Sequence, residues 1–236
     1  MDTQNKIAIV IPAYNEEKVI YSVIDNIKKS LESKKFNYEI VVVDDSSKDN
    51  TILESKKAGV VVIPHILNMG SGGATATGLS YAQQNGFDIA ATVDADGQHE
   101  AKDIIKGIEM MQASDVDLLI GSRLIDSEGM SKTKVLGNKG LSIITNILFG
   151  VKSTDSQSGL RIFSKKALDS LKWKSSGYEF CSEMLWRAKQ CGLKIDEYPI
   201  TAIYTEYSKS KGQNNWNSIN IIKSLLYRRV MELFGE

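Results

Sequence analysis

The sequence has few of the residues on which disulfide-rich or zinc-binding proteins depend. Its 236 residues include two cysteines, Cys181 and Cys191, and two histidines, His65 and His99. Two cysteines exclude a disulfide framework and favour a reducing compartment, and two histidines are too few for a His-rich zinc site. The fold therefore has to be stabilised by a hydrophobic core, for which a chain of this length is sufficient.

A surplus of charge and long hydrophobic runs are also missing. The 29 basic residues balance the 29 acidic ones, which argues against a general nucleic-acid-binding protein. No segment approaches the ~20 apolar residues of a membrane span, and the early run 7–11 is too short for a signal peptide. We expect a cytoplasmic protein, with peripheral contact at the inner face of the membrane as a further interpretation.

The sequence does contain an alternation of short apolar strands and helical patterns, which indicates parallel strands joined by right-handed crossovers. We expect one α/β domain over residues 1–236, with a mostly parallel sheet in 1–122 and a helical, loop-rich half in 123–236 that ends in an amphipathic helix. The predicted strands are 7–11, 40–43, 60–63, 89–93 and 118–120, and the predicted helices of the first half are 16–31 (with Asn15 as N-cap), 48–57, 71–84 and 101–111.

Polar segments follow four of the predicted strands. In a parallel α/β sheet, ligands bind outside the carboxyl ends of the strands. The position of these segments therefore predicts a binding site at one edge of the sheet. The four segments are 12–16 (Pro-Ala-Tyr-Asn-Glu), 44–47 (Asp-Asp-Ser-Ser), 94–98 (Asp-Ala-Asp-Gly-Gln) and 121–123 (Gly-Ser-Arg).

Asp94 and Asp96 form the most informative pair in these segments. One residue separates them in an extended stretch, so both side chains point to the same side of the backbone. A cation would relieve their repulsion, and oxygen ligands suit Mg²⁺ or Mn²⁺, which also bind substrate phosphates. Gln98 repeats the spacing and offers a third oxygen. A solvated Asp-rich turn is the alternative, but the strand-end position favours a metal site.

Other strand-end residues allow two interpretations each. Asp44 accepts hydrogen bonds from a nucleobase or ribose, or its segment only caps the next helix. Tyr14 borders a base, or it fills space beneath its loop. Gly70 opens a glycine-rich turn, which permits either a phosphate at the helix N-terminus or tight helix packing. The spacing G-x-G-G does not match the dinucleotide-binding fingerprint G-x-G-x-x-G.

Six segments occur in the same order as in the family 2 glycosyltransferases with the GT-A fold, and the chain resembles the dolichol-phosphate mannosyltransferase-like branch of that family. The resemblance covers roughly residues 6–200. It implies a Rossmann-like sheet, a UDP- or GDP-sugar donor, a divalent metal and inversion at the anomeric carbon. The six segments are 12–16, 44–51 (Asp-Asp-Ser-Ser-Lys-Asp-Asn-Thr), 68–70 (Asn-Met-Gly), 94–98, 121–123 and 155–161 (Asp-Ser-Gln-Ser-Gly-Leu-Arg).

The resemblance also implies roles for individual residues. Arg123 would contact a diphosphate or the acceptor phosphate, and Asp155 would begin an acceptor-side loop. The remaining implied contacts are the nucleoside pocket, formed by Pro12, Tyr14, Glu16 and Asp44, and the metal–diphosphate group, formed by Asp94, Asp96 and Gln98.

The acceptor decides whether a catalytic base is needed. A sugar hydroxyl must lose its proton to a base, whereas a lipid phosphate is already ionised. Asp155 and Glu183 are the candidate bases, although Asp155 is alternatively a turn former and Glu183 alternatively pairs with Arg187. Lys209 and Lys211 are candidates for a donor-binding segment that closes over the diphosphate, or for a solvated basic stretch.

Acceptor and partners stay open at this point. Thr205 and Ser208 stand where the lipid-phosphate branch usually has arginine and glycine, so the acceptor is a polyprenyl phosphate, a lipid-linked sugar or a glycan of the cell envelope. The apolar positions of 141–149 and of the last helix, near 215–234, fit a membrane surface, core packing or a homo-oligomer interface.

Two other functions compete with a glycosyltransferase. A sugar-nucleotidyltransferase needs a glycine-rich loop with arginine and lysine after the first strand, and segment 12–16 lacks one. A nucleotide-sugar-binding module without turnover is the third hypothesis, motivated by the departures near Thr205.

Overall fold

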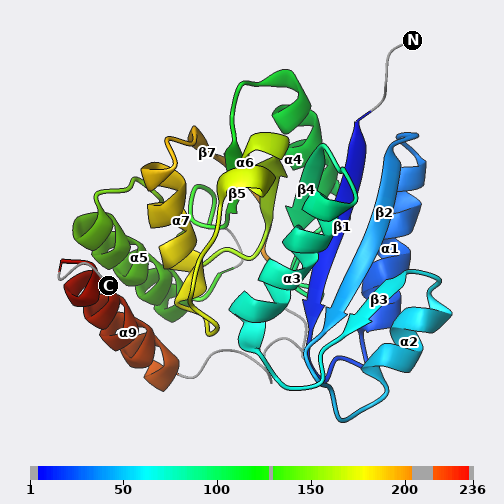
Figure 1. Ribbon diagram of the computed structural model, residues 1–236, viewed down its shortest axis with the longest axis horizontal. Coiled ribbons are helices and arrows are strands. Elements are labelled where there is room, and N and C mark those ends of the chain that lie inside the picture. Colours follow the sequence, from blue (N-terminus) through cyan, green and yellow to red (C-terminus); the bar gives the residue numbers. More distant parts are fainter. Residues whose placement is uncertain (1–4, 128–129, 204–214, 234–236) are drawn as a thin grey trace.

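The computed structural model describes residues 5–127, 130–203 and 215–233, and it has helices on both faces of one sheet (Figure 1). The strands are β1 (Lys6–Ala13), β2 (Asn37–Asp44), β3 (Val61–Pro64), β4 (Ile89–Thr92), β5 (Leu118–Ser122), β6 (Arg161–Ser164) and β7 (Ile195–Pro199). The helices are α1 (Ile20–Glu32), α2 (Thr51–Lys57), α3 (Gly70–Gln84), α4 (Ala101–Ala113), α5 (Lys132–Phe149), α6 (Lys165–Ser170), α7 (Phe180–Gln190) and α9 (Asn215–Leu233).

The strand order within the described chain is β3-β2-β1-β4-β6-β5-β7. All neighbours are parallel except β6, which is antiparallel to both β4 and β5. The predicted mostly parallel α/β sheet is therefore confirmed, and the five predicted strands exist. The sequence did not reveal β6 and β7, because β6 begins with a charged arginine and β7 (Ile-Asp-Glu-Tyr-Pro) is largely polar at the edge of the sheet.

The core lies in two layers, one on each face of the sheet. Ile7, Ile9 and Ile11 of β1 pack with α1 and α4, whereas Ala8 and Val10 pack with α3, α6 and α7 on the other face. This alternation is the two-residue period of a strand that is buried on both sides. Helices α5 and α9 add an outer layer beside α7, at the left of Figure 1.

The first helix begins later than predicted. α1 starts at Ile20, and its N-cap residue Val19 makes no side-chain capping bond, so the predicted cap at Asn15 is wrong. Asn15 instead adopts a left-handed conformation (φ 55°), and its Oδ1 accepts a hydrogen bond from Lys48 N at 2.8 Å. Asparagine tolerates this conformation better than most residues. The side chain that looked like a helix cap therefore joins two strand-end loops.

The second half is helical and rich in loops, as expected. α5 is longer than the predicted segment 141–149, and α9 closely matches the predicted last helix. Among the helices that the structure describes, none combines the length and hydropathy needed to cross a bilayer.

Candidate active site

The polar segments predicted from strand ends meet at one edge of the sheet. The arrowheads of β1 and β2 point to the lower edge in Figure 1, and parallel pairing brings the ends of β1, β2 and β4 together there. Pro12 and Ala13 at the end of β1 lie beside Val43 and Asp44 at the end of β2. Arg123 follows directly after β5.

Asp94 lies just after β4, and its carboxylate is held by neighbours on two sides. Its Oδ2 contacts His99 Nε2 at 3.1 Å, and the His99 side chain is almost fully buried. On the other side lies Gly159, where an added Cβ would come within 2.2 Å of both carboxylate oxygens. A glycine at position 159 is thus required for the carboxylate to occupy this place.

Asp96 is bound by its own turn. Its Oδ1 accepts a hydrogen bond from Gln98 N at 3.0 Å, and its Oδ2 accepts one from Gln98 Nε2 at 2.5 Å. In this arrangement the Gln98 side chain serves Asp96 through its amide nitrogen. The Gln98 side-chain carbonyl oxygen is therefore the atom that would act as the predicted metal ligand.

The pKa values of the two carboxylates shift in opposite directions. Burial raises the pKa of Asp94, but the hydrogen bond from His99 and the positive charges of Arg123 and Arg161 outweigh it, so this pKa lies below its usual value. Burial and the negative charge of Asp94 raise the pKa of Asp96. The two acids are therefore close enough to repel each other, as the sequence analysis predicted.

The oxygen atoms of Asp94, Asp96 and Gln98 fit a metal cation that a substrate also coordinates. Within the described part of the chain, no cluster of three or more His, Cys, Asp or Glu side chains could hold a metal alone. Mg²⁺ and Mn²⁺ sites commonly use one or two carboxylates and complete their coordination with waters and substrate phosphates. Asp94, Asp96 and the Gln98 carbonyl oxygen match that pattern.

Asp44 presents an unpaired oxygen at the end of β2. Its side chain is fully buried; Oδ2 accepts a hydrogen bond from Ser47 N at 3.0 Å, and Oδ1 has no partner within the described residues. A buried carboxylate oxygen without a partner is costly unless a ligand satisfies it. Tyr14 is half exposed and follows Ala13, which lies beside Asp44 in the sheet, and Glu16 is buried with its charge acting on Asp96. These positions suit the predicted nucleoside pocket.

Gly70 has the contacts of one of the two interpretations left open by the sequence, tight helix packing. Its N–H donates to the carboxylate of Asp45 at 2.8 Å, and Met69 N donates to the same carboxylate at 2.7 Å. A Cβ at position 70 would lie 2.4 Å from the carbonyl oxygen of Ser176. Gly70 therefore permits tight packing and binds a protein carboxylate, which leaves no support for the predicted phosphate contact.

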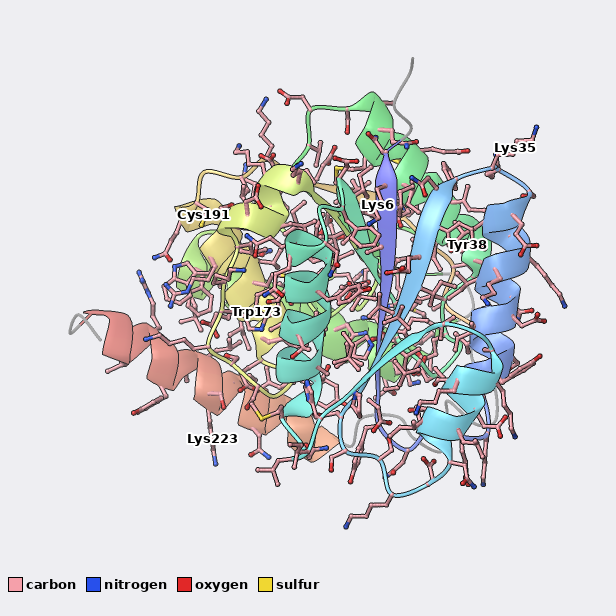
Figure 2. All side chains as sticks on the ribbon, turned by 45° about the vertical axis from the view of Figure 1, so that its right-hand side comes forward. Lys6, Lys35, Tyr38, Trp173, Cys191 and Lys223 are labelled. Carbon is pink, nitrogen blue, oxygen red and sulfur yellow. The ribbon has the colours of Figure 1, made fainter. Side chains whose placement is uncertain are left out.

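Asp45 was not singled out from the sequence, yet it organises this edge. It accepts a bond from His65 Nδ1 at 2.8 Å, and His65 Nε2 lies 3.0 Å from Thr77 Oγ1 of α3. Gly72 N donates to Ser176 O at 2.7 Å. Trp173 Nε1 donates to Gly72 O at 3.2 Å, and Figure 2 shows Trp173 beside α3. The start of α3 is thus fixed to β2 and to loop 171–179.

Arg123 and Asp155 form a bidentate ion pair. Arg123 Nε donates to Asp155 Oδ2 at 2.7 Å, Nη2 donates to Oδ1 at 2.9 Å, and the backbone N–H of Arg123 adds a third bond at 3.1 Å. The Asp155 side chain is fully buried. Both carboxylate oxygens of Asp155 are thus occupied by Arg123. Asp155 therefore positions the guanidinium, and this geometry does not fit the predicted catalytic base.

Glu183 is also fully bound. Its carboxylate accepts hydrogen bonds from Lys174 N at 3.0 Å, from Ser175 N at 2.8 Å and from Ser175 Oγ. Arg187 Nε lies 3.5 Å away, so the alternative pairing predicted for this acid is confirmed. Glu183 is fully buried. It fixes the loop before α7, and this placement does not support the predicted role as a catalytic base.

The loop that carries Asp155 is anchored by Glu197 of β7. The Glu197 carboxylate accepts bonds from Ser153 Oγ at 2.7 Å, Thr154 N at 2.9 Å and Thr154 Oγ1 at 2.5 Å. Glu197 was not predicted from the sequence, because nothing in a polar edge strand marks one acid as an anchor.

Arg161 supports the same loop from inside. It is almost fully buried, and it donates to the carbonyl oxygens of Ser156, Ser158 and Cys181 at 2.8–3.1 Å. Its charge also contributes to the low pKa of Asp94. The last residue of the segment 155–161 is therefore structural and electrostatic.

Tyr178 borders the acidic group and was not predicted to do so. Burial raises its pKa, and the charges of Asp94, Asp96 and Glu16 raise it further. These four side chains thus share one electrostatic environment. The predicted donor contacts Lys209 and Lys211, and the departures at Thr205 and Ser208, lie outside the described residues.

Comparisons with known proteins give the family of the chain. The sequence profile of Glycosyl transferase family 2 matches residues 8–172. An uncharacterized protein of Methanocaldococcus jannaschii, MJ1222, is 44% identical over 235 residues, which cover 96% of this chain and 93% of that protein. The UDP-N-acetylglucosamine–dolichyl-phosphate N-acetylglucosaminyltransferase of Methanococcus voltae is 43% identical over 253 residues, covering 98% and 97%.

A solved structure shows the same fold at low sequence identity. The glucosyl-3-phosphoglycerate synthase of Mycobacterium tuberculosis, crystallised with Mn²⁺, UDP-glucose and glycerol 3-phosphate, superimposes with a TM-score of 0.68 at 20% identity, covering 95% of this chain and 80% of that one. The chain therefore belongs to glycosyl transferase family 2, and it is a glycosyltransferase with the GT-A fold.

Proposed function

We propose that this enzyme transfers a sugar from a nucleotide sugar to a polyprenyl phosphate, with a divalent metal and with inversion at the anomeric carbon. UDP is the preferred nucleoside diphosphate, because the relative from Methanococcus voltae is named for UDP-N-acetylglucosamine and the Mycobacterium structure holds UDP-glucose. The unpaired Oδ1 of Asp44 supports a nucleoside at the end of β2.

The metal would be held by Asp94, Asp96 and the carbonyl oxygen of Gln98. When bound, such a cation supplies positive charge that stabilises the departing diphosphate. The chain's own contribution is to keep Asp94 ionised through His99 and to hold Arg123 beside it. Gly159 leaves room for this arrangement.

One observation carries the choice of acceptor: both candidate bases are already bound to other groups. Asp155 is paired with Arg123, and Glu183 accepts hydrogen bonds from the loop before α7. A hydroxyl acceptor requires a base, whereas a phosphate monoester arrives ionised. A phosphate acceptor therefore fits the site better than a sugar hydroxyl, and the relative from Methanococcus voltae is named for dolichyl phosphate.

Arg123 is the residue that we assign to the phosphate groups of the reaction. Asp155 fixes its guanidinium through two parallel hydrogen bonds, and the charge of Arg123 acts on Asp94. A guanidinium in a fixed orientation recognises phosphate oxygens well.

We further place the enzyme at the cytoplasmic face of a membrane that contains the lipid acceptor, in keeping with its two free cysteines.

A thermal-shift experiment tests the donor site. UDP-N-acetylglucosamine with Mn²⁺ should raise the melting temperature of the purified chain, since a ligand that binds only the folded state stabilises it. Asp96→Ala should abolish the metal-dependent part of this shift. The exposed acid Asp115 gives the matched control, and Asp115→Ala should leave the shift unchanged. Binding that ignores both metal and Asp96 would contradict the proposal.

A transfer assay tests the acceptor. Incubation with the same donor and dolichyl phosphate should yield a sugar-labelled lipid that partitions into organic solvent. Donor binding without transfer to any polyprenyl phosphate would contradict this acceptor while leaving the donor site intact.

A further inference from the structure

Gln157 is the partly exposed member of a group of polar side chains that is otherwise buried. Its Nε2 donates to Ser182 Oγ at 2.9 Å and to Ser156 Oγ at 3.2 Å. Buried polar groups are costly unless they are hydrogen-bonded, and a satisfied group of them holds its members in one arrangement. The buried members come from α5, from the loop before β6 and from α7, and they are Ser142, Thr145, Ser156 and Ser182.

The orientation of the Gln157 amide follows from a chain of hydroxyl groups. Thr145 Oγ1 donates its one proton to the carbonyl oxygen of Leu141 at 2.9 Å. The 2.8 Å contact between Thr145 Oγ1 and Ser182 Oγ therefore has Ser182 as its donor. Ser182 Oγ then has no proton left, so it can only accept from Gln157. The amide has to turn its nitrogen toward α7 and its carbonyl oxygen Oε1 away from it.

The Oε1 atom of Gln157 is left for a partner outside the protein. Within the described part of the chain, no group donates a hydrogen bond to it. Oε1 is also in contact with solvent, since the buried side-chain polar atoms that lack a partner in this part are Asp44 Oδ1, His99 Nδ1 and Ser158 Oγ. A carbonyl oxygen accepts hydrogen bonds and donates none, so its partner must carry an O–H or N–H group.

The loop of Gln157 lies beside Asp94, on the side away from the proposed nucleoside pocket. Arg161 at the start of β6 pairs with Thr92 at the end of β4, so the loop before β6 opens at the same edge of the sheet as Asp94. In the strand order, β6 follows β4 on the side opposite to β1 and β2. Gly159 touches the Asp94 carboxylate, and the two-residue step from Gly159 to Gln157 spans at most about 7 Å.

The start of α7 lies in the same electrostatic environment. Burial raises the pKa of the Cys181 thiol to about 11, and the charges of Asp94, Arg123 and Asp155 also act on it. Cys181 directly precedes Ser182 in α7. The hydroxyl that orients the amide is therefore close to the proposed metal and phosphate contacts.

A nucleotide sugar that lies along this edge would reach the loop before β6 with its sugar. The proposed nucleoside contact, Asp44, is at the end of β2, and the proposed diphosphate contacts, Asp94 and Asp96, follow β4. The sugar is joined to the far phosphate, so it would extend past β4 toward the start of β6. Ionised phosphates have no proton to donate, whereas a sugar offers hydroxyl groups and, when N-acetylated, an amide N–H. The sugar is thus the part of the donor that matches Oε1 of Gln157.

We propose that Gln157 is a specificity-determining residue that accepts a hydrogen bond from a hydroxyl or amide N–H group of the transferred sugar. The proposal rests on the proposed function, since it takes the donor to be a nucleotide sugar. Thr145 and Ser182 are positioning residues, because they set which atom of the amide faces the sugar.

Calorimetric titration with Mn²⁺ and without acceptor measures what the sugar adds to binding. The dissociation constants of UDP, UDP-glucose and UDP-N-acetylglucosamine are compared. Gln157→Met keeps the length of the side chain and removes the amide, so it should weaken binding of UDP-N-acetylglucosamine about three- to tenfold and leave UDP unchanged. An equal loss for UDP-glucose assigns the contact to a hydroxyl, and no loss for UDP-glucose assigns it to the amide N–H. The exposed Gln112 of α4 gives the matched control, and Gln112→Met should change nothing.

A second variant tests the orientation of the amide at a residue behind it. Thr145→Val removes the acceptor of the Ser182 proton, so Ser182 Oγ can donate to Oε1 and the amide of Gln157 can turn its nitrogen toward the sugar. Affinity for UDP-N-acetylglucosamine should fall about threefold with UDP unchanged, and UDP binding reports that the variant is folded. Because both changes act through one hydrogen bond, the double variant should bind no more weakly than Gln157→Met alone.

The outcomes separate this inference from the proposed function. Failure of the unmodified protein to bind UDP with Mn²⁺ would overturn both. Normal UDP binding, with the same affinity for UDP-N-acetylglucosamine in Gln157→Met and in the unmodified protein, would overturn the inference alone. So would a Gln157→Met variant that loses as much affinity for UDP as for the nucleotide sugar, since the change would then have disturbed the whole site.

Discussion

Replacing Gly159 by alanine is expected to disable the active site with little effect on the fold. The added Cβ would lie 2.2 Å from both carboxylate oxygens of Asp94, whereas ordinary van der Waals contact begins at 3.4 Å. The carboxylate therefore has to move by about 1 Å, and a displacement of that size at a reacting group lowers rates by about 100-fold. The Asp94 side chain is partly exposed, so it can move toward solvent. The loss of folding stability should therefore be smaller than that of an overpacked core, which is about 1–3 kcal/mol.

The assay compares kcat/KM for sugar transfer with the melting temperature of the apo protein. Gly159→Ala should lose about two orders of magnitude in kcat/KM, and it should also lose most of the Mn²⁺-dependent shift produced by the donor. Gly137→Ala is the matched control, because no heavy atom lies within 4 Å of its added Cβ. An alanine variant at position 159 with unchanged kcat/KM would refute the assignment of Asp94 to the reaction.

Three further outcomes follow from the anchoring contacts. Arg161→Met removes the hydrogen bonds to three carbonyl oxygens and takes away the donor that binds the loop oxygens of Ser156 and Ser158, so urea denaturation should show a loss of about 3 kcal/mol or more. Glu197→Ala frees Thr154 and should lower kcat/KM about tenfold with an unchanged KM for the donor; equal loss in donor binding would contradict an acceptor-side role. Asp117, despite partial burial, has a lowered pKa because Lys166 and two other donors bind it. Its stabilisation is present above the unfolded pKa and is lost as pH falls through the lower folded value, so Asp117→Asn should be less stable than wild type near neutral pH, and the difference should begin to shrink below about pH 4 and disappear only at lower pH, below the folded pKa.

The cluster of polar residues at the ends of β1, β2 and β4 was predictable because its residues are local in sequence. Asp44 and Asp94 follow apolar strands directly, and the rule that ligands bind at the carboxyl ends of parallel strands places them together. Burial on both faces made β1, β2 and β4 easy to recognise as unbroken apolar runs.

The contacts of the second half of the chain could not be predicted in the same way, since they join residues that are distant in the sequence. Asp155 reads as a turn former or a base until Arg123, 32 residues away, is seen to bind it. Glu183 is an ordinary helix acid in the sequence, and only the fold brings the backbone of Lys174 and Ser175 to its carboxylate. Gly70 fits two interpretations in the sequence, and its close approach to Ser176 supports tight packing.

The place of β6 in the sheet has a consequence for the integrity of the chain. This strand comes from the second half of the sequence, yet it sits between β4 and β5 of the first half. A fragment that ends at residue 122 would leave β4 and β5 without the strand that joins them, and exposed strand edges invite aggregation. We therefore expect limited proteolysis to give no stable N-terminal core, and separately expressed halves to regain structure only when they are mixed.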